Sequence, residues 1–258
     1  MNRLASMPVT EQRVVIAEAA ERLQIKPVIV EKDFWVCWVL GLLFGHQEWS
    51  EALVFKGGTA LSKVFGIIRR FSEDIDLSVS PVTLGISEAK VNEAGSRRQR
   101  DQWMENLEAA CGKWVMERLQ PDFEQSIRAV IGLRPGEQSW LEFQLDAATH
   151  SPVLLSYYSR HYADVAAMAN RPEAERALAD DALRERVVNW KARFFARSWA
   201  RYDLAAPGTF RLVPPPVRVA ELARDYQEMQ DMFLDAPMSF DMILETLRRL
   251  EARINQSA

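Results

Sequence analysis

Apolar residues recur at helical spacing through the first part of the chain. We expect an amphipathic helix over residues 9–23, because its apolar side chains fall on one face. Pro27 then stands where a second helix begins. The residues that follow it, through 44, are apolar on almost every side, which is typical of a buried helix.

Two short segments after this helix have strand character. Residues 52–56 are mostly apolar and end at Gly57-Gly58, which predicts a strand followed by a tight turn. Thr59 is then expected to cap a helix over about 60–68. Residues 75–79 alternate and predict a second strand, which Pro81 ends.

The middle of the chain predicts a long helix and a hairpin. Residues 90–119 are amphipathic, and three arginines, Arg97, Arg98 and Arg100, make their first part basic. Residues 126–133 and 139–145 are predicted as two strands that the turn 134–137 joins into a hairpin.

From about residue 158 the composition shifts to alanine, arginine and leucine without any strand pattern. Helices are expected near 160–169, 173–178, 181–199, 217–234 and 239–254. The chain therefore divides into a predicted α/β part, residues 1–158, and a helical domain, residues 159–258.

Composition narrows the classes of function. The 258 residues are 48% hydrophobic and 26% charged, which is ordinary for a globular chain and excludes wholesale disorder. The 32 basic and 36 acidic residues give a net charge of −4, which excludes a uniformly basic nucleic-acid coat. Two cysteines and three separated histidines favour neither a disulfide framework nor a zinc site, so a metal would be held by carboxylates.

Targeting signals are not visible in the sequence. The first residues lack the apolar stretch of a signal peptide, and the longest uncharged run, 34–47, is too short to cross a bilayer. We therefore expect a cytoplasmic protein with no membrane partner.

The strongest chemical signal is a turn followed by paired carboxylates. Gly57 and Gly58 allow a ligand to approach the backbone, and Lys56 adds positive charge beside them. Asp74 and Asp76 stand two residues apart, so on one strand they share a face. Paired carboxylates beside a phosphate-binding turn suit divalent cations. The spacing is not that of a P-loop.

These motifs carry a resemblance to a known family. KGGTALSKVFG followed by RRFSEDIDLSV resembles the AbiEii/AbiGii abortive-infection toxins of the nucleotidyltransferase superfamily. Segments 31–35, 159–164, 190–195, 210–214 and 225–229 are similar to further family motifs, in the same order.

The resemblance implies a fold, an activity and a set of roles. The fold would be α+β: a nucleotidyltransferase-like mixed β-sheet core with N-terminal helices and a C-terminal helical domain. The enzyme would be a Mg²⁺-dependent toxin with two metal ions, moving a nucleoside monophosphate from an NTP to an RNA, with tRNA the expected acceptor. A cognate antitoxin would be its partner.

Residue roles follow from the same resemblance. Asp74 and Asp76 would hold Mg²⁺, and Asp164 would belong to a late catalytic motif. Its alternative role is a helix-surface carboxylate paired with Arg160. The nucleotide phosphates would lie against Lys56, Gly57, Gly58, Thr59 and Ser72.

One family segment does not appear in the sequence. Ahead of Ser159 the family carries a strand of the form h-E-h-G-A-R and a helix of the form R-T-F-W-E-K-A, which supply a third carboxylate and a lysine. Either the chain has an internal deletion, or the sequence omits a stretch of the natural protein. Glu142, Asp146 and His161 are substitute candidates for the base, and Lys32 is a further candidate ligand.

Three functions remain open at this point. The first is the RNA-modifying toxin. The second is a catalytically impaired homologue that binds a nucleotide or an antitoxin, which the absent segment favours. The third is a transferase for a small molecule or a protein hydroxyl, since the same two motifs would serve it.

Overall fold

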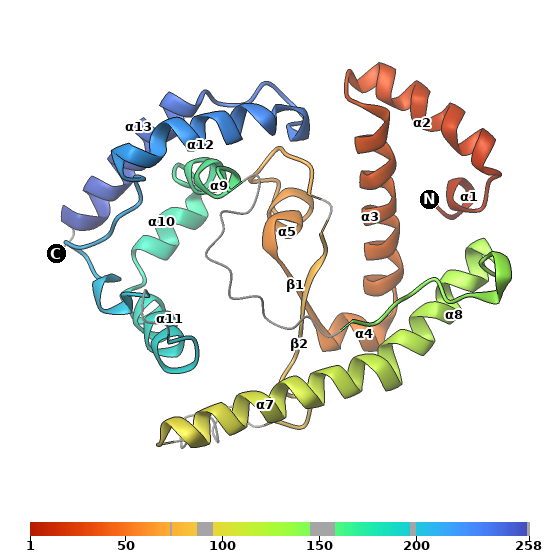
Figure 1. Cartoon of the computed structure of the whole chain (residues 1–258), viewed down its shortest axis with the longest axis horizontal. Coiled ribbons are helices and arrows are strands. Elements are labelled where there is room, and N and C mark those ends of the chain that lie inside the picture. Colours follow the sequence, from red (N-terminus) through yellow and green to blue (C-terminus); the bar gives the residue numbers. More distant parts are fainter. Residues whose placement is uncertain (73, 87–94, 145–157, 197–199, 257–258) are drawn as a thin grey trace. The chain divides into compact units, whose positions relative to one another are not determined.

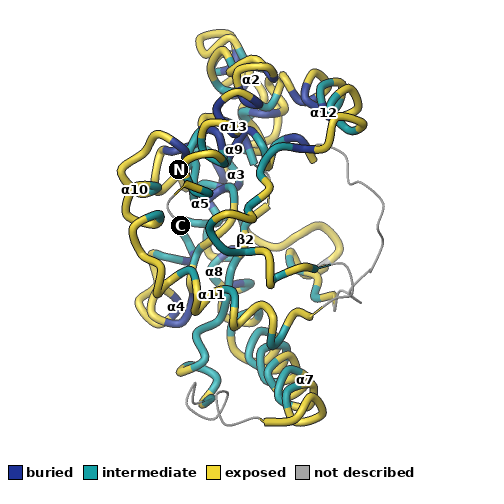
Figure 2. The backbone as a smooth tube through the Cα atoms, turned by 90° about the vertical axis from the view of Figure 1, so that its left-hand side faces the viewer, coloured by how far each residue is buried: buried dark blue, intermediate teal, exposed yellow. Residues whose placement is uncertain are grey.

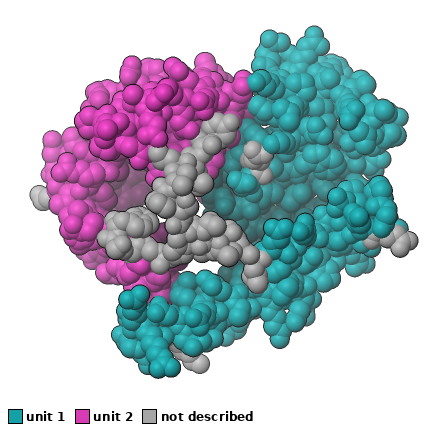
Figure 3. All heavy atoms as spheres, viewed as in Figure 1, with its two compact units in different colours: residues 1–60, 71–151 teal, residues 61–70, 152–258 magenta. Residues whose placement is uncertain are grey.

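The computed structural model describes residues 1–72, 74–86, 95–144, 158–196 and 200–256 (Figure 1). The chain divides into two compact units (Figure 3). Unit 1 comprises Met1–Ala60 and Phe71–Ser151, and unit 2 comprises Leu61–Arg70 and Pro152–Ala258. Each unit has its own apolar core. No helix among the described residues is long and apolar enough to cross a membrane.

Unit 1 contains most of the N-terminal helices and a small sheet. In order its elements are α1 (Asn2–Ala5), α2 (Val9–Leu23), α3 (Pro27–Gly45), α4 (Gln47–Ala52), β1 (Leu53–Lys56), the start of α5 (Gly57–Lys63), β2 (Asp76–Val79), α7 (Arg97–Trp114), the π-helical turn η1 (Val115–Leu119), α8 (Gln120–Ile131) and the 3-10 turn η2 (Pro135–Glu137). The predicted helices at 9–23 and from Pro27 are confirmed. Trp38 and Leu43 of α3 lie in the core, as its apolar sequence predicts.

The sheet is an antiparallel pair of strands, β1 and β2, which we call the hairpin although α5 lies between them in the sequence. β1 pairs with β2 so that Phe55 lies opposite Leu77 and Lys56 opposite Asp76. Leu53 is buried and Val54 exposed, which is the alternation expected of a sheet with one covered face. The α+β class is confirmed. Among the described residues the sheet has these two strands, so the mixed nucleotidyltransferase-like sheet remains a prediction.

Unit 2 is helical. Beyond the end of α5 it contains α9 (Arg160–Met168), α10 (Pro172–Leu178), α11 (Asp181–Phe194), η3 (Tyr202–Leu204), α12 (Pro216–Glu228), η4 (Gln230–Met232) and α13 (Phe240–Gln256). The predicted helices of this region are confirmed, although α11 and α12 are shorter than predicted. α9 packs against α13, and buried residues from both, with Leu222 and Tyr226 of α12, form the core (Figure 2).

The predicted hairpin at 126–145 is wrong. Residues 126–131 belong to α8, whose apolar side chains Phe123 and Ile127 face the core at helical spacing. Gly132, with φ of +79°, ends that helix. Residues 139–144 form no strand, because the N–H groups of Trp140 and Leu141 donate to the carboxylate of Glu124.

Glu124 therefore fixes the segment after α8. Burial of its carboxylate favours a raised pKa, but hydrogen bonds from Trp140 N–H, Arg128 and the Ser139 hydroxyl outweigh burial and lower the pKa. The charged form stabilises the fold above the ordinary pKa of a glutamate, and this contribution is lost as the pH falls through the lowered value.

We expect Glu124→Gln to lower the free energy of unfolding by about 1–3 kcal/mol at neutral pH, because a charged acceptor of several donors is lost. Urea denaturation measures the difference. The difference in free energy of unfolding between wild type and variant should narrow below pH 4. A difference that stays constant with pH would contradict the stabilising role of the charged Glu124. Glu142→Gln, an exposed change in the same segment, is the control.

Candidate functional site

The site is built on the hairpin and on the turn that follows β1. Lys56 ends β1 directly opposite Asp76, the first residue of β2. Both side chains are exposed. The pairing therefore brings a positive and a negative side chain to the same end of the hairpin, where the chain turns into α5.

Position 57 requires glycine for two reasons: its backbone conformation and the nearby side chain of Asp76. Its φ is +76°, a left-handed conformation that favours glycine. A Cβ atom built on Gly57 would lie 1.9 Å from Oδ2 of Asp76 and 2.7 Å from its Cγ. The Asp76 carboxylate thus lies directly against the Gly57 backbone, in space that any side chain at 57 would fill.

Thr59 connects the turn to the second carboxylate. Its side chain is buried, and its hydroxyl donates to the backbone carbonyl oxygen of Asp74. The prediction that Thr59 caps a helix is wrong, because α5 begins at Gly57. The hydroxyl instead joins the glycine turn to the strand that follows in the sequence.

Asp74 and Asp76 differ in how they are placed. Asp76 begins β2, whereas Asp74 precedes the strand. The alternation of side chains along a strand therefore does not by itself place the two carboxylates on one face. Asp74 is located by the Thr59 hydrogen bond and Asp76 by its contact with Gly57. The side chains of both are exposed, and Ser72 beside them is half-buried.

The donor set suits a hard cation. Mg²⁺ in nucleotide sites is commonly held by one or two carboxylates, with phosphate and water oxygens as its other ligands. Asp74 and Asp76 fit this requirement. Over the described ranges, no group of three or more histidine, cysteine or acidic side chains gathers, so any third protein carboxylate would have to come from elsewhere in the chain.

We expect Thr59→Val to lower the free energy of unfolding by about 1–3 kcal/mol, because it buries the Asp74 carbonyl without its donor while keeping the side-chain volume. Chemical denaturation checks this value. Thr59→Ser, which keeps the hydroxyl, is the control and should lose less; if the serine variant loses more than the valine variant, the hydrogen bond is not what stabilises the turn.

Asp164 lies in unit 2 and is buried. Its two carboxylate oxygens accept from the guanidinium of Arg70: Nε to Oδ1 at 2.8 Å and the terminal nitrogen to Oδ2 at 2.6 Å. Arg70 is 4% exposed. The partner of Asp164 is therefore Arg70 and not Arg160, so the predicted surface pair one turn apart is wrong.

The structure describes three of the four remaining candidates. Lys32 is exposed on α3, and Glu142 is exposed with Gln144 donating to it. His161 is on α9, where partial burial and the charge of Arg160 lower its pKa. Asp146 lies outside the described residues. None of these positions supplies a third carboxylate to the hairpin in the part of the chain that the structure describes.

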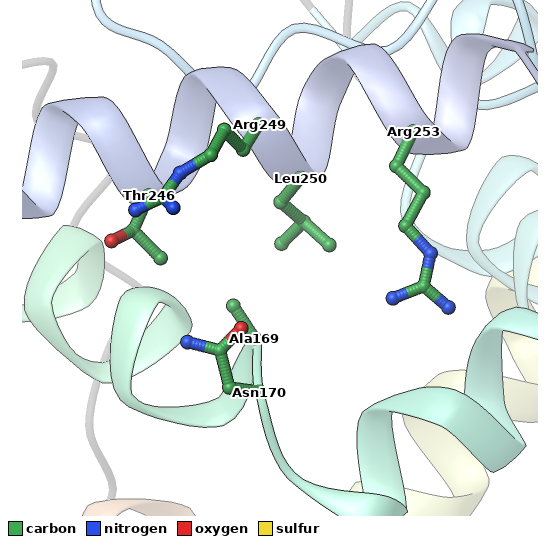
Figure 4. Close-up of a pocket in the computed structure, with 6 residues that line it drawn as sticks. All are labelled: Ala169, Asn170, Thr246, Arg249, Leu250 and Arg253. Carbon is green, nitrogen blue, oxygen red and sulfur yellow. The ribbon is translucent and has the colours of Figure 1, made fainter.

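Two pockets open on unit 2. The smaller, about 100 Å³, lies between the end of α9 and α13 and is lined by Ala169, Asn170, Thr246, Arg249, Leu250 and Arg253 (Figure 4). The larger, about 420 Å³, is lined by residues of α10, α11 and α13 and by Pro207 and Phe210. Neither lining contains a site residue predicted from the sequence.

The partners of Thr59 and Arg70 could not be predicted from the sequence. Thr59 was expected at a helix cap and no partner was expected for Arg70, whereas both residues are buried and hydrogen-bonded to distant positions. A buried arginine ninety-four residues from its partner leaves no local periodicity to read.

The comparison with protein-family models gives a match. The family model described as "Nucleotidyl transferase AbiEii toxin, Type IV TA system" matches residues 41–157. The match contains Lys56–Thr59, Ser72, Asp74 and Asp76. No curated protein matches the chain. No solved structure matches it either.

Proposed function

We propose that this chain, whose residues 41–157 match the family model of the AbiEii nucleotidyl transferase toxins of type IV toxin–antitoxin systems, transfers a nucleoside monophosphate from an NTP to an RNA hydroxyl, with tRNA the expected acceptor. The observation that supports this most is the Asp76 carboxylate held against Gly57 and opposite Lys56. A carboxylate fixed at a glycine turn is suited to a metal–triphosphate ligand.

The residues of the hairpin divide the work of binding. Asp74 and Asp76 would hold Mg²⁺, which when bound supplies charge stabilisation to the attacking and leaving oxygens. The backbone of Gly57 and Gly58, with no Cβ in the way, would lie along the β and γ phosphates. Lys56 and Ser72 would add a charge and a hydroxyl to the same ligand.

The reaction is an in-line displacement at the α-phosphorus. A bond forms between the acceptor hydroxyl oxygen and the α-phosphorus. The bond between the α-phosphorus and the oxygen that bridges it to the β-phosphorus breaks, and pyrophosphate leaves. The hydroxyl proton passes to solvent water in the same step. The contribution of this chain is to hold the triphosphate in line with the acceptor, which is where most of the catalysis in such reactions arises.

The family also implies an antitoxin partner. We propose that the chain acts in the cytoplasm and that a cognate antitoxin relieves its toxicity. The basic start of α7, with Arg97, Arg98 and Arg100 exposed or half-buried, suits RNA phosphates as sequence-independent contacts.

A second candidate function is binding without turnover. The two-carboxylate hairpin, with no third acidic group among the described residues around it, favours this alternative. Such a homologue would retain the metal–nucleotide site and lack the group that completes catalysis. A transferase that modifies a small molecule or a protein hydroxyl uses the same two motifs.

A labelling experiment separates these functions. The purified chain is incubated with Mg²⁺, total RNA and each α-³²P-labelled NTP in turn, with the γ-labelled NTP as the control. Label from the α position in RNase-sensitive material supports the RNA transferase. RNase-resistant label supports the third function, and NTP binding without transferred label supports the binding-only homologue.

A further inference from the structure

A ten-residue segment, Leu61–Arg70, interrupts the candidate site. The residues before it, through Ala60, and the residues after it, from Phe71, belong to unit 1, whereas the segment itself belongs to unit 2. Its two ends are covalently joined to the glycine turn on one side and to the aspartate strand on the other. The segment is therefore the peptide link between the two halves of the motif.

Several contacts attach this segment to unit 2, and the strongest is buried. Arg70 donates to both oxygens of Asp164 on α9, at 2.8 and 2.6 Å. The backbone N–H of Leu234 donates to the carbonyl of Arg69 at 3.0 Å, and Arg70 forms a β-bridge with Phe233. The Arg69–Asp235 ion pair beside them is exposed.

The burial of Asp164 limits what it can do directly. Its side chain is 12% exposed and that of Arg70 is 4% exposed. Both oxygens are engaged by a planar guanidinium, which is the bidentate geometry that favours a fixed structure. The Asp164 carboxylate therefore binds Arg70 with both of its oxygens, whereas the carboxylates of Asp74 and Asp76 are exposed and available to a ligand.

We propose that Asp164 is a positioning residue: through Arg70 it holds Leu61–Arg70 on unit 2, and this segment, whose ends join the glycine turn and the residues before β2, supports the contacts of Thr59 with Asp74 and of Gly57 with Asp76. This inference rests on the proposed function for its catalytic consequence. It replaces the direct catalytic role that the resemblance implies for Asp164.

A double-substitution experiment distinguishes positioning from direct catalysis. Removing one member of a buried ion pair leaves the other charge buried and unpaired. This lowers stability more than replacing both members with apolar residues does. We expect Asp164→Leu and Arg70→Met each to lower kcat for label transfer about 100-fold, as misplaced catalytic groups do. The double variant R70M/D164L should recover most of that loss. If it is as inactive as Asp164→Leu while folded, Asp164 acts directly and the proposal is overturned.

The matched control removes the exposed pair on the same segment. Asp235→Asn breaks the Arg69 ion pair without burying a charge, and it should change kcat less than about twofold. A larger effect would mean that the segment is held mainly at Arg69, which contradicts the importance given to Arg70.

Hydrogen exchange tests the proposal without any activity. In Asp164→Asn, amide exchange should rise about tenfold or more in peptides covering 61–70 and also in those covering 74–79, while α2 and α3 are unchanged. Faster exchange confined to unit 2 would overturn the positioning role. If the wild-type chain transfers no label, the proposed function fails, and the exchange result still decides whether Asp164 orders the aspartate strand.

Discussion

We expect Asp76→Asn to lower label transfer about 100-fold or more, and Asp74→Asn to do the same. The two variants remove a charge from a group that would hold Mg²⁺, while leaving the side-chain shape almost unchanged. Because both side chains are exposed, their loss should cost little folding free energy. The expected signature is therefore a large loss of kcat in a protein that unfolds at the wild-type denaturant concentration.

The control for these two variants is Asp101→Asn. Asp101 is an exposed carboxylate of the same unit, paired only loosely with Arg97 on α7 at 3.8 Å. Its substitution makes the same change of charge away from the hairpin, and transfer should stay within about twofold of wild type. Equal activity in wild type and in both hairpin variants would remove Asp74 and Asp76 from the active site.

Gly57→Ala is the second substitution with a large expected effect. The new Cβ would lie 1.9 Å from the Asp76 carboxylate oxygen, on a backbone with φ of +76°. Either the carboxylate or the turn must move. We expect transfer to fall as far as it does in Asp76→Asn, together with a loss of about 1–3 kcal/mol in the free energy of unfolding.

Gly85→Ala separates the two causes. Gly85 also has a positive φ, +67°, but a Cβ there meets nothing within 4 Å. It therefore carries the backbone cost without the collision. Kinetics and urea denaturation of both variants should show a comparable loss of stability but full transfer activity in Gly85→Ala. If Gly57→Ala also retains activity, the position of Asp76 against the turn is not needed for the reaction.

The sequence predicted the parts of the fold that depend on local spacing. The helices at 9–23 and 160–169 and the hairpin strands appear because apolar period and turn residues act within a few positions. Residues 126–131 of the strand predicted at 126–133 are helical, because Phe123 and Ile127 of the same helix pack into the core of unit 1 at helical spacing. Short apolar runs of this kind suit either structure until their packing partners are known.

In the candidate site, too, the sequence predicts what depends on residue type and local spacing but not the contacts between distant residues. Gly57, Asp74 and Asp76 could be recognised from the sequence because residue type and spacing carry their chemistry. The hydroxyl bond from Thr59 to Asp74 and the burial of Asp164 with Arg70 could not, because they join positions fifteen and ninety-four residues apart. Such contacts are set by tertiary packing, and a single sequence holds no periodic signal for them.

The most direct measurement of the central claim is metal–nucleotide binding by the hairpin itself. Mn²⁺ replaces Mg²⁺, and electron paramagnetic resonance counts the bound ion with and without a non-hydrolysable NTP analogue. We predict that the wild-type chain binds Mn²⁺ more tightly when the analogue is present and that the double variant D74N/D76N does not. Equal binding by the two proteins would contradict the assignment of the site to Asp74 and Asp76.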